Sequence, residues 1–139
     1  MALPQSRESR QFYRAGLQRF EDAQCLLRSE VRTTGAIYLA GYGVECLLKS
    51  LVLSHVPVSQ QPDVASTFRG RRAHNFDWLK ERYYQLQGSH FPPEISRSFT
   101  LVNTWGTEWR YRSGLAAPRE AERFLQAADE IIQWVDGRL

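Results

Sequence analysis

The chain has 139 residues, 42% of them hydrophobic and 24% charged, which is an ordinary composition for a soluble globular protein with one buried core. Its net charge of +3 is mild, and its basic residues are mostly arginines, whose planar fork of donors suits phosphate and carboxylate groups. This balance permits a nucleic acid or nucleotide as partner without requiring one. We predict a single domain over residues 1–139, with a core of about 9–136 and a loop at 56–72.

The sequence argues against two kinds of membrane-directed segment. Residues 1–11 are polar and lack the apolar core of a signal peptide. The longest apolar run, Gly35 to Leu53, carries Glu45 and Lys49 in its second half, and these charges disfavour a bilayer span of about 20 residues. We therefore expect a cytoplasmic protein without a membrane partner.

The two cysteines do not form a recognisable site. Cys25 and Cys46 both lie inside apolar helical patterns, and neither has a partner at metal-ligand spacing. This placement favours two buried thiols in a reduced chain over a disulfide or a zinc site. We predict no metal and no cofactor.

The first predicted helix covers about Ser9 to Ser29, where apolar residues recur every three or four positions and form one stripe. Either Ser9 or Ser6 can cap it. The stripe consists of Phe12, Tyr13, Gly16, Leu17, Phe20, Ala23, Leu26 and Leu27.

The second predicted helix, about Thr34 to Leu53, is apolar nearly all round, which is typical of a central helix covered by others. Small residues such as Gly41 and Gly43 would let neighbouring backbones approach closely. Glu45 and Lys49 stand four residues apart in the favourable order. They form either a structural ion pair at the helix edge or a functional pair in a water-filled cleft.

The helical spacing of apolar residues is absent from 56–72, which we predict to be a loop. This loop ends in the basic run RGRR. A short third helix begins at about His74, with Asn75 as a candidate cap. Its predicted inward-facing residues are Phe76, Leu79, Tyr83 and Leu86.

Pro93 can open a fourth helix, which we expect at about 94–105. The last helix is predicted at about 118–135, with Gly137 as its stop. No stretch alternates in the way a half-buried strand does. We therefore predict an all-α fold, an up-down bundle of four to five helices with two long antiparallel helices at its start.

Four segments in this order resemble the HEPN domain family over about residues 12–135. They are AIYLAGYGVECLLK (36–49), AHNFDWL (73–79), WRY (109–111) and AERFLQAADEIIQW (121–134). The resemblance implies a HEPN-like helical bundle that commonly forms a homodimer, with a function tied to RNA or nucleotides. Many members are metal-independent ribonucleases, often toxins or defence effectors. Others are partners of minimal nucleotidyltransferases or non-catalytic binding modules.

The ribonuclease members carry an arginine followed by a histidine after four to six residues, and these groups of two subunits meet across the dimer cleft. This chain departs from that pattern, because no histidine follows Arg110 or Arg112. The spacing occurs only at Arg69 and His74. If the protein is an enzyme, His74 would be the base and Arg69 a phosphate clamp. The alternative for His74 is a capping or packing role at the start of its helix.

A binding module without catalysis would use the same region. The candidate phosphate-binding residues are Lys49, Arg71, Arg72, Arg110 and Arg112, and the candidate stacking residues are Trp109 and Tyr111. From the family placement we expect Glu45 to orient Arg110, leaving Lys49 toward the cleft.

We favour a HEPN-like RNA- or nucleotide-binding module that is the small partner of a nucleotidyltransferase or of a toxin-antitoxin or defence system. The first alternative is the metal-independent endoribonuclease. The second is a helical adaptor that acts through protein-protein contacts.

Overall fold

The computed structural model describes residues 4, 6–87 and 90–139; residues 1–3, 5, 88 and 89 lie outside it, and with them part of the polar segment 1–11. Its helices are α1 (Arg7–Cys25), α2 (Thr33–Ser54), α3 (Gln61–Ser66), α4 (Phe76–Gln87), α5 (Pro93–Val102) and α6 (Pro118–Asp136). Four shorter helical segments join them: η1 (Leu26–Glu30), η2 (Val58–Gln60), η3 (Arg71–His74) and η4 (Thr107–Tyr111). The described residues contain no strand, so the all-α prediction is confirmed. The six α-helices exceed the predicted four to five.

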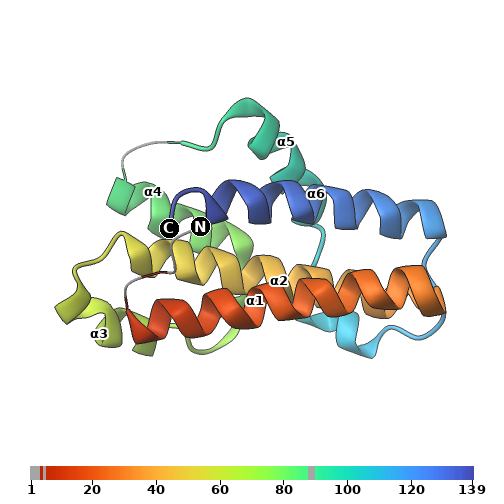
Figure 1. Ribbon diagram of the computed structural model, residues 1–139, viewed down its shortest axis with the longest axis horizontal. Coiled ribbons are helices and arrows are strands. Elements are labelled where there is room, and N and C mark those ends of the chain that lie inside the picture. The colour runs from red at the N-terminus through yellow and green to blue at the C-terminus, as the bar shows by residue number, and fades with distance from the viewer. Residues whose placement is uncertain (1–3, 5, 88–89) are drawn as a thin grey trace.

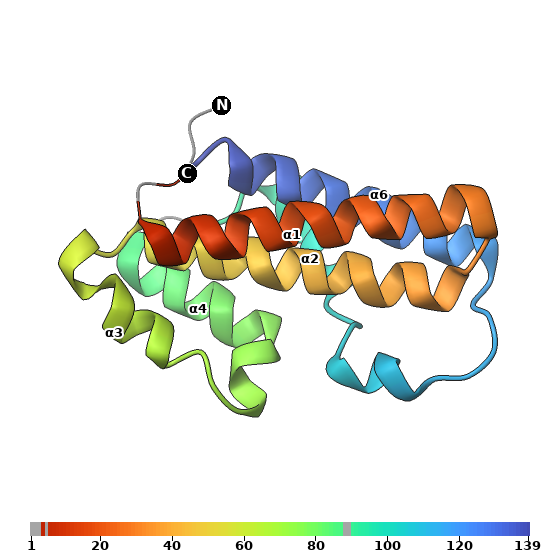
Figure 2. The same ribbon diagram turned by 60° about the horizontal axis from the view of Figure 1, so that its bottom comes forward.

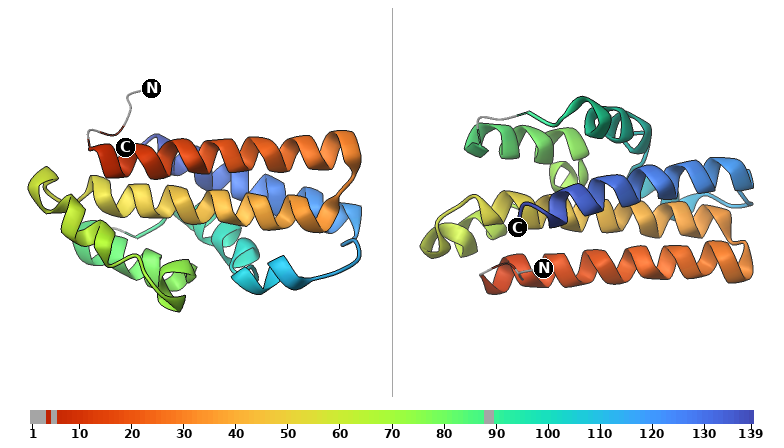
Figure 3. Two further views of the ribbon diagram at one scale, coloured as in Figure 1. Left: turned by 90° about the horizontal axis from the view of Figure 1, so that it is seen from below. Right: turned by 45° about the horizontal axis from the view of Figure 1, so that its top comes forward.

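Helix α2 lies at the centre of the bundle. In Figure 1 the long helices α1, α2 and α6 run alongside one another, with α1 antiparallel to α2 and the end of α6 beside the start of α1. Helices α4 and α5 cover the face of α2 and α6 that lies away from α1 (Figure 3). The predicted pair of long antiparallel helices is therefore α1 and α2.

The segment that we expected to be a loop contains the short helix α3. Pro62 occupies its first turn, where a proline is compatible with a helix and does not break it. After the helix, the ring of Phe68 packs edge-on against Phe12 at 5.7 Å and against Trp78 at 6.2 Å between centroids. These contacts hold the segment against α1 and α4.

Helix α1 begins two residues earlier than predicted, because Ser6 is its cap. The backbone N–H of Ser9 donates to the Ser6 hydroxyl at 3.0 Å. The Ser9 side chain is buried and lies 2.8 Å from the Ser50 hydroxyl on α2. Further along the same interface, a Cβ on Gly43 would stand 2.9 Å from the carbonyl oxygen of Gly16. The two helices therefore pack more closely than larger residues would allow.

By length and composition α2 could cross a membrane, and it is the one helix of the described residues with that property. Its most apolar window is 83% buried inside the protein. The helix thus provides the core of the bundle, as its all-round apolar pattern predicted. The prediction for Leu86 was wrong, because this residue of α4 is 44% exposed.

The cysteines differ in environment, contrary to the prediction that both are buried. Cys46 on α2 is buried, which raises the pKa of its thiol to about 12, with the nearby Glu45 carboxylate adding to the effect. Cys25 is exposed at the end of α1.

We expect a disulfide-exchange reagent to titrate one thiol rapidly in the native protein, since thiolates and not thiols react. Both thiols should react after denaturation. The Cys25→Ser variant should lose the fast phase, and a fast phase that survives in this variant would contradict the burial of Cys46.

Candidate functional site

The carboxylate of Glu45 lies at the centre of a buried charged network on α2. The side chain is 2% exposed and has a partner for each oxygen. The Lys49 ammonium donates to Oε2 at 2.8 Å, and Nδ1 of His74 lies 3.0 Å from Oε1. Because an ionised carboxylate only accepts hydrogen bonds, we assign the ring proton to Nδ1. The other ring nitrogen, Nε2, is then left for a ligand.

The residues next to His74 in the sequence fix its position at the end of η3. Ala73 is buried, and so is Phe76 at the start of α4. The Asn75 side chain accepts a hydrogen bond from the backbone N–H of Trp78 at 3.0 Å, which confirms the predicted cap. The His74 side chain stays 43% exposed even though it is anchored to a buried carboxylate. It is therefore both oriented and accessible.

A polar cavity of about 290 Å³ adjoins His74 between η3 and η4. Arg71 and His74 line it from η3, while Thr107 and Glu108 line it from η4. Figure 2 shows these two segments next to each other below α2. The cavity thus joins two segments that lie more than thirty residues apart in the sequence.

The indole of Trp105 fixes the segment before η4 against α2. It stacks on Phe76 at 5.2 Å and on Tyr38 at 5.9 Å between centroids. Its Nε1 donates to the carbonyl oxygen of Tyr38 at 3.2 Å. The ring lies so close to Gly41 that a Cβ at this position would collide with it. Gly41, the first glycine of the GYG sequence in α2, therefore leaves the space that the Trp105 indole occupies.

A family model for the HEPN domain matches residues 9–138. The chain belongs to the HEPN family. The match covers α1 from Ser9 onward and the other five α-helices of the described residues, together with Glu45, His74 and η4. No curated protein and no solved structure matches the chain significantly. The family relates the HEPN chain to RNA or nucleotides and leaves its partner open.

The arginines predicted to bind phosphate are exposed in this HEPN domain. Arg69, Arg71 and Arg72 lie on η3 and the segment before it, whereas Arg110 and Arg112 lie on η4 and just after it. The Arg72 guanidinium lies 5.3 Å from the ring centroid of Trp78. The η4 segment also presents Tyr111, which is 80% exposed and has the Arg110 guanidinium 5.4 Å from its ring centroid.

The contacts of Glu45 and Lys49 in the structure differ from the roles predicted for them. Both oxygens of Glu45 are taken by Lys49 and His74, while Arg110 donates through Nε to the carbonyl oxygen of Thr107 at 3.2 Å. The expected pairing of Glu45 with Arg110 was therefore wrong. The expectation that Lys49 faces the cleft was wrong as well, because its ammonium is buried over the rings of Phe12 and Phe68.

Among the aromatic neighbours of the site, Trp109 is buried and two tyrosines were overlooked. Trp109 is 5% exposed, so most of its indole belongs to the core and only a small part of it can contact a ligand. Tyr38 and Tyr42 precede Glu45 on the same stripe of α2, at a spacing of four and then three residues. Burial raises the pKa of Tyr38, and Arg110 opposes this effect. The stripe of tyrosines leading to Glu45 is a signal that sequence reasoning could have used.

The described residues contain no group of three or more histidine, cysteine, aspartate or glutamate side chains that could hold a metal ion.

Proposed function

We propose that this HEPN domain binds RNA or a nucleotide through its phosphates at the surface formed by His74, Arg71 and η4. The observation that carries the proposal is the exposed His74 ring held by the buried Glu45 carboxylate. The Arg71 guanidinium, which lines the polar cavity, offers donors to a phosphate, and the oriented ring of His74 offers Nε2 as an acceptor for a ligand hydroxyl. Membership of the family supports the ligand class.

Each part of the surface has a chemical role. Arg69, Arg71 and Arg72 supply guanidinium groups for phosphates, with Arg110 and Arg112 on the opposite wall. Tyr111 supplies a stacking face, a contact worth about 1–3 kcal/mol per base. Glu45 and Lys49 do not touch the ligand in this proposal; they hold His74 in place.

The second candidate function is the metal-independent endoribonuclease. The specific observation in its favour is that a carboxylate orients His74, as it orients the histidine of many general bases. His74 Nε2 would take the proton from the 2′-hydroxyl as its oxygen attacks the adjacent phosphorus, and Arg69 or Arg71 would stabilise the charge on the phosphorane. The P–O5′ bond would then break, with the 5′ oxygen taking a proton from water and a 2′,3′-cyclic phosphate left on the other fragment.

The proposed function also includes an assembly and a cellular location. We propose that the domain acts in the cytoplasm as a homodimer, beside a nucleotidyltransferase or within a toxin-antitoxin or defence system. HEPN domains commonly dimerise, which supports this part. An adaptor role would use the same assembly without a nucleic-acid ligand.

Binding is tested by fluorescence anisotropy with a labelled single-stranded RNA and with a labelled nucleotide at several salt concentrations. Arg71→Ala and Arg72→Ala should weaken RNA binding, and each lost phosphate contact should reduce the slope of log K against log salt by about 0.7. His74→Ala should weaken binding of both probes. Arg28→Ala, an exposed arginine on η1, is the matched control and should bind as wild type does.

Incubation of the protein with total RNA and EDTA separates the two functions. Cleavage by the wild type that disappears in His74→Ala would favour the ribonuclease. Intact RNA with both proteins, together with salt-dependent binding, would favour the module. Absence of binding and of cleavage would contradict both and leave the adaptor.

A further inference from the structure

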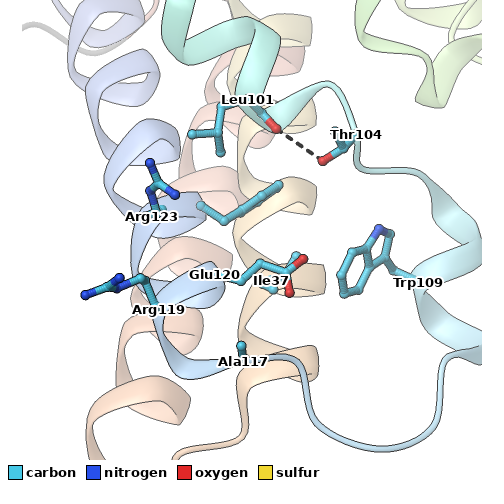
Figure 4. A pocket seen from close by; sticks show the side chains of 9 residues that line it. Ile37, Leu101, Thr104, Trp109, Ala117, Arg119, Glu120 and Arg123 are labelled. Carbon is cyan, nitrogen blue, oxygen red and sulfur yellow. Dashed lines mark hydrogen bonds between the residues drawn. The ribbon is translucent and has the colours of Figure 1, made fainter.

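A second cavity, of about 520 Å³, lies between α2, α5, η4 and the start of α6 (Figure 4). Its floor is apolar and consists of Ile37, Phe124 and Trp109. Neither His74 nor the arginines of η3 line it, while η4 contributes Trp109 to this cavity and Thr107 and Glu108 to the cavity beside His74. A concave apolar site of this size with a few polar groups is typical of small-molecule sites.

The cavity wall includes a hydrogen-bond donor without a partner. Trp109 is buried, and its indole Nε1, which is itself closed off from solvent, has no hydrogen-bond partner among the described residues. The Arg112 guanidinium lies 3.7 Å from the centroid of the same ring and adds a positive charge behind it. Because an unpaired buried donor is costly, a shift of the indole that brings Nε1 to an acceptor on a ligand would stabilise the site.

The start of α6 adds further donors at the rim. Helix α6 begins after Ala117, which itself lines the cavity, and no side chain caps it. The first backbone N–H groups of a helix lack intrahelical acceptors and carry a partial positive charge. Ala117 before this helix start and the Trp109 indole thus line the same cavity.

The rim charges favour an anion. The lining residues carry two guanidinium groups, those of Arg119 and Arg123, and one carboxylate, that of Glu120. In Figure 4 the Glu120 carboxylate faces Trp109, while the guanidinium groups of Arg119 and Arg123 point away from it. All three side chains are exposed and can rearrange around a ligand.

We propose that this cavity binds a small amphipathic anion. Its apolar body lies between Ile37, Phe124 and Trp109, and its carboxylate, sulfonate or phosphate group is bound by Arg119 and Arg123. The Trp109 indole and the start of α6 provide neutral donors to the same ligand. Glu120 opposes binding, because its carboxylate repels the anion.

The first test uses the fluorescent anion anilinonaphthalene sulfonate and its uncharged analogue N-phenylnaphthylamine. The Arg119→Gln/Arg123→Gln variant should bind the anion roughly three- to tenfold more weakly, since the lost charges are exposed, and bind the analogue unchanged. Glu120→Gln should bind the anion more tightly. The Arg14→Gln/Arg28→Gln variant, which removes two positive charges from exposed positions outside this cavity, is the control for net charge and should have no effect.

The second test locates the probe. In a ¹H–¹⁵N spectrum the indole signal of Trp109, assigned with Trp109→Phe, should shift on addition of the anion more than the signals of the other tryptophans. The proposal is overturned if the anion does not bind or if that signal stays in place. It is also overturned if Glu120→Gln weakens anion binding or the double arginine variant leaves it unchanged.

Discussion

Replacing Glu45 with alanine is expected to lower the free energy of unfolding by about 3–5 kcal/mol, because one partner of a buried ion pair is removed. The Lys49 ammonium would remain buried without its carboxylate, and His74 would lose the acceptor of its Nδ1 proton. RNA or nucleotide binding should weaken in the same variant, since the ring is no longer oriented. Urea denaturation measures the first effect, and anisotropy measures the second.

A matched control is Asp22→Ala, which removes a half-exposed pair with Arg19 at 3.0 Å and should cost less than about 1 kcal/mol. The double variant Glu45→Leu/Lys49→Met separates stability from binding. Replacing both charges by apolar residues of similar size should recover most of the stability but none of the His74 orientation. If Glu45→Ala changed neither the unfolding midpoint nor the affinity, the proposed network would be wrong.

The second large effect concerns the indole that holds η4. Trp105→Ala should cost about 3–5 kcal/mol of unfolding free energy, as truncation of a buried tryptophan usually does. The loss of its stacking on Phe76 and of its hydrogen bond to Tyr38 should also release the wall of the cavity beside His74. We therefore expect weaker ligand binding even under conditions where the variant is folded.

Tyr111→Ala provides the control on η4 itself. This side chain is 80% exposed, so its removal should change stability by no more than about 0.5 kcal/mol. It should still weaken RNA binding if Tyr111 stacks on a base.

Equal stability of Trp105→Ala and wild type in urea would show that the Trp105 indole does not hold the segment before η4.

Local patterns in the sequence predicted the elements of this fold and some of the site. Helical periodicity located the long helices to within a few residues, and side-chain chemistry identified Asn75 as a cap. The spacing of Glu45 and Lys49 predicted an ion pair, because residues four apart on one helix are neighbours. The helix α3 was missed because Pro62 is compatible both with a loop and with the first turn of a helix.

Only the tertiary structure decided how distant residues meet. His74 stands 29 residues after Glu45 and becomes its second partner, the place that we expected Arg110 to take. Trp105 packs against Gly41 and so determines where η4 lies. Periodicity reports which residues share a face of one helix, whereas these contacts depend on how separate segments pack against α2. The sequence by itself therefore determined an all-α HEPN domain with an ion pair on its second helix, and packing determined that this pair is buried and that His74 is the second partner of Glu45.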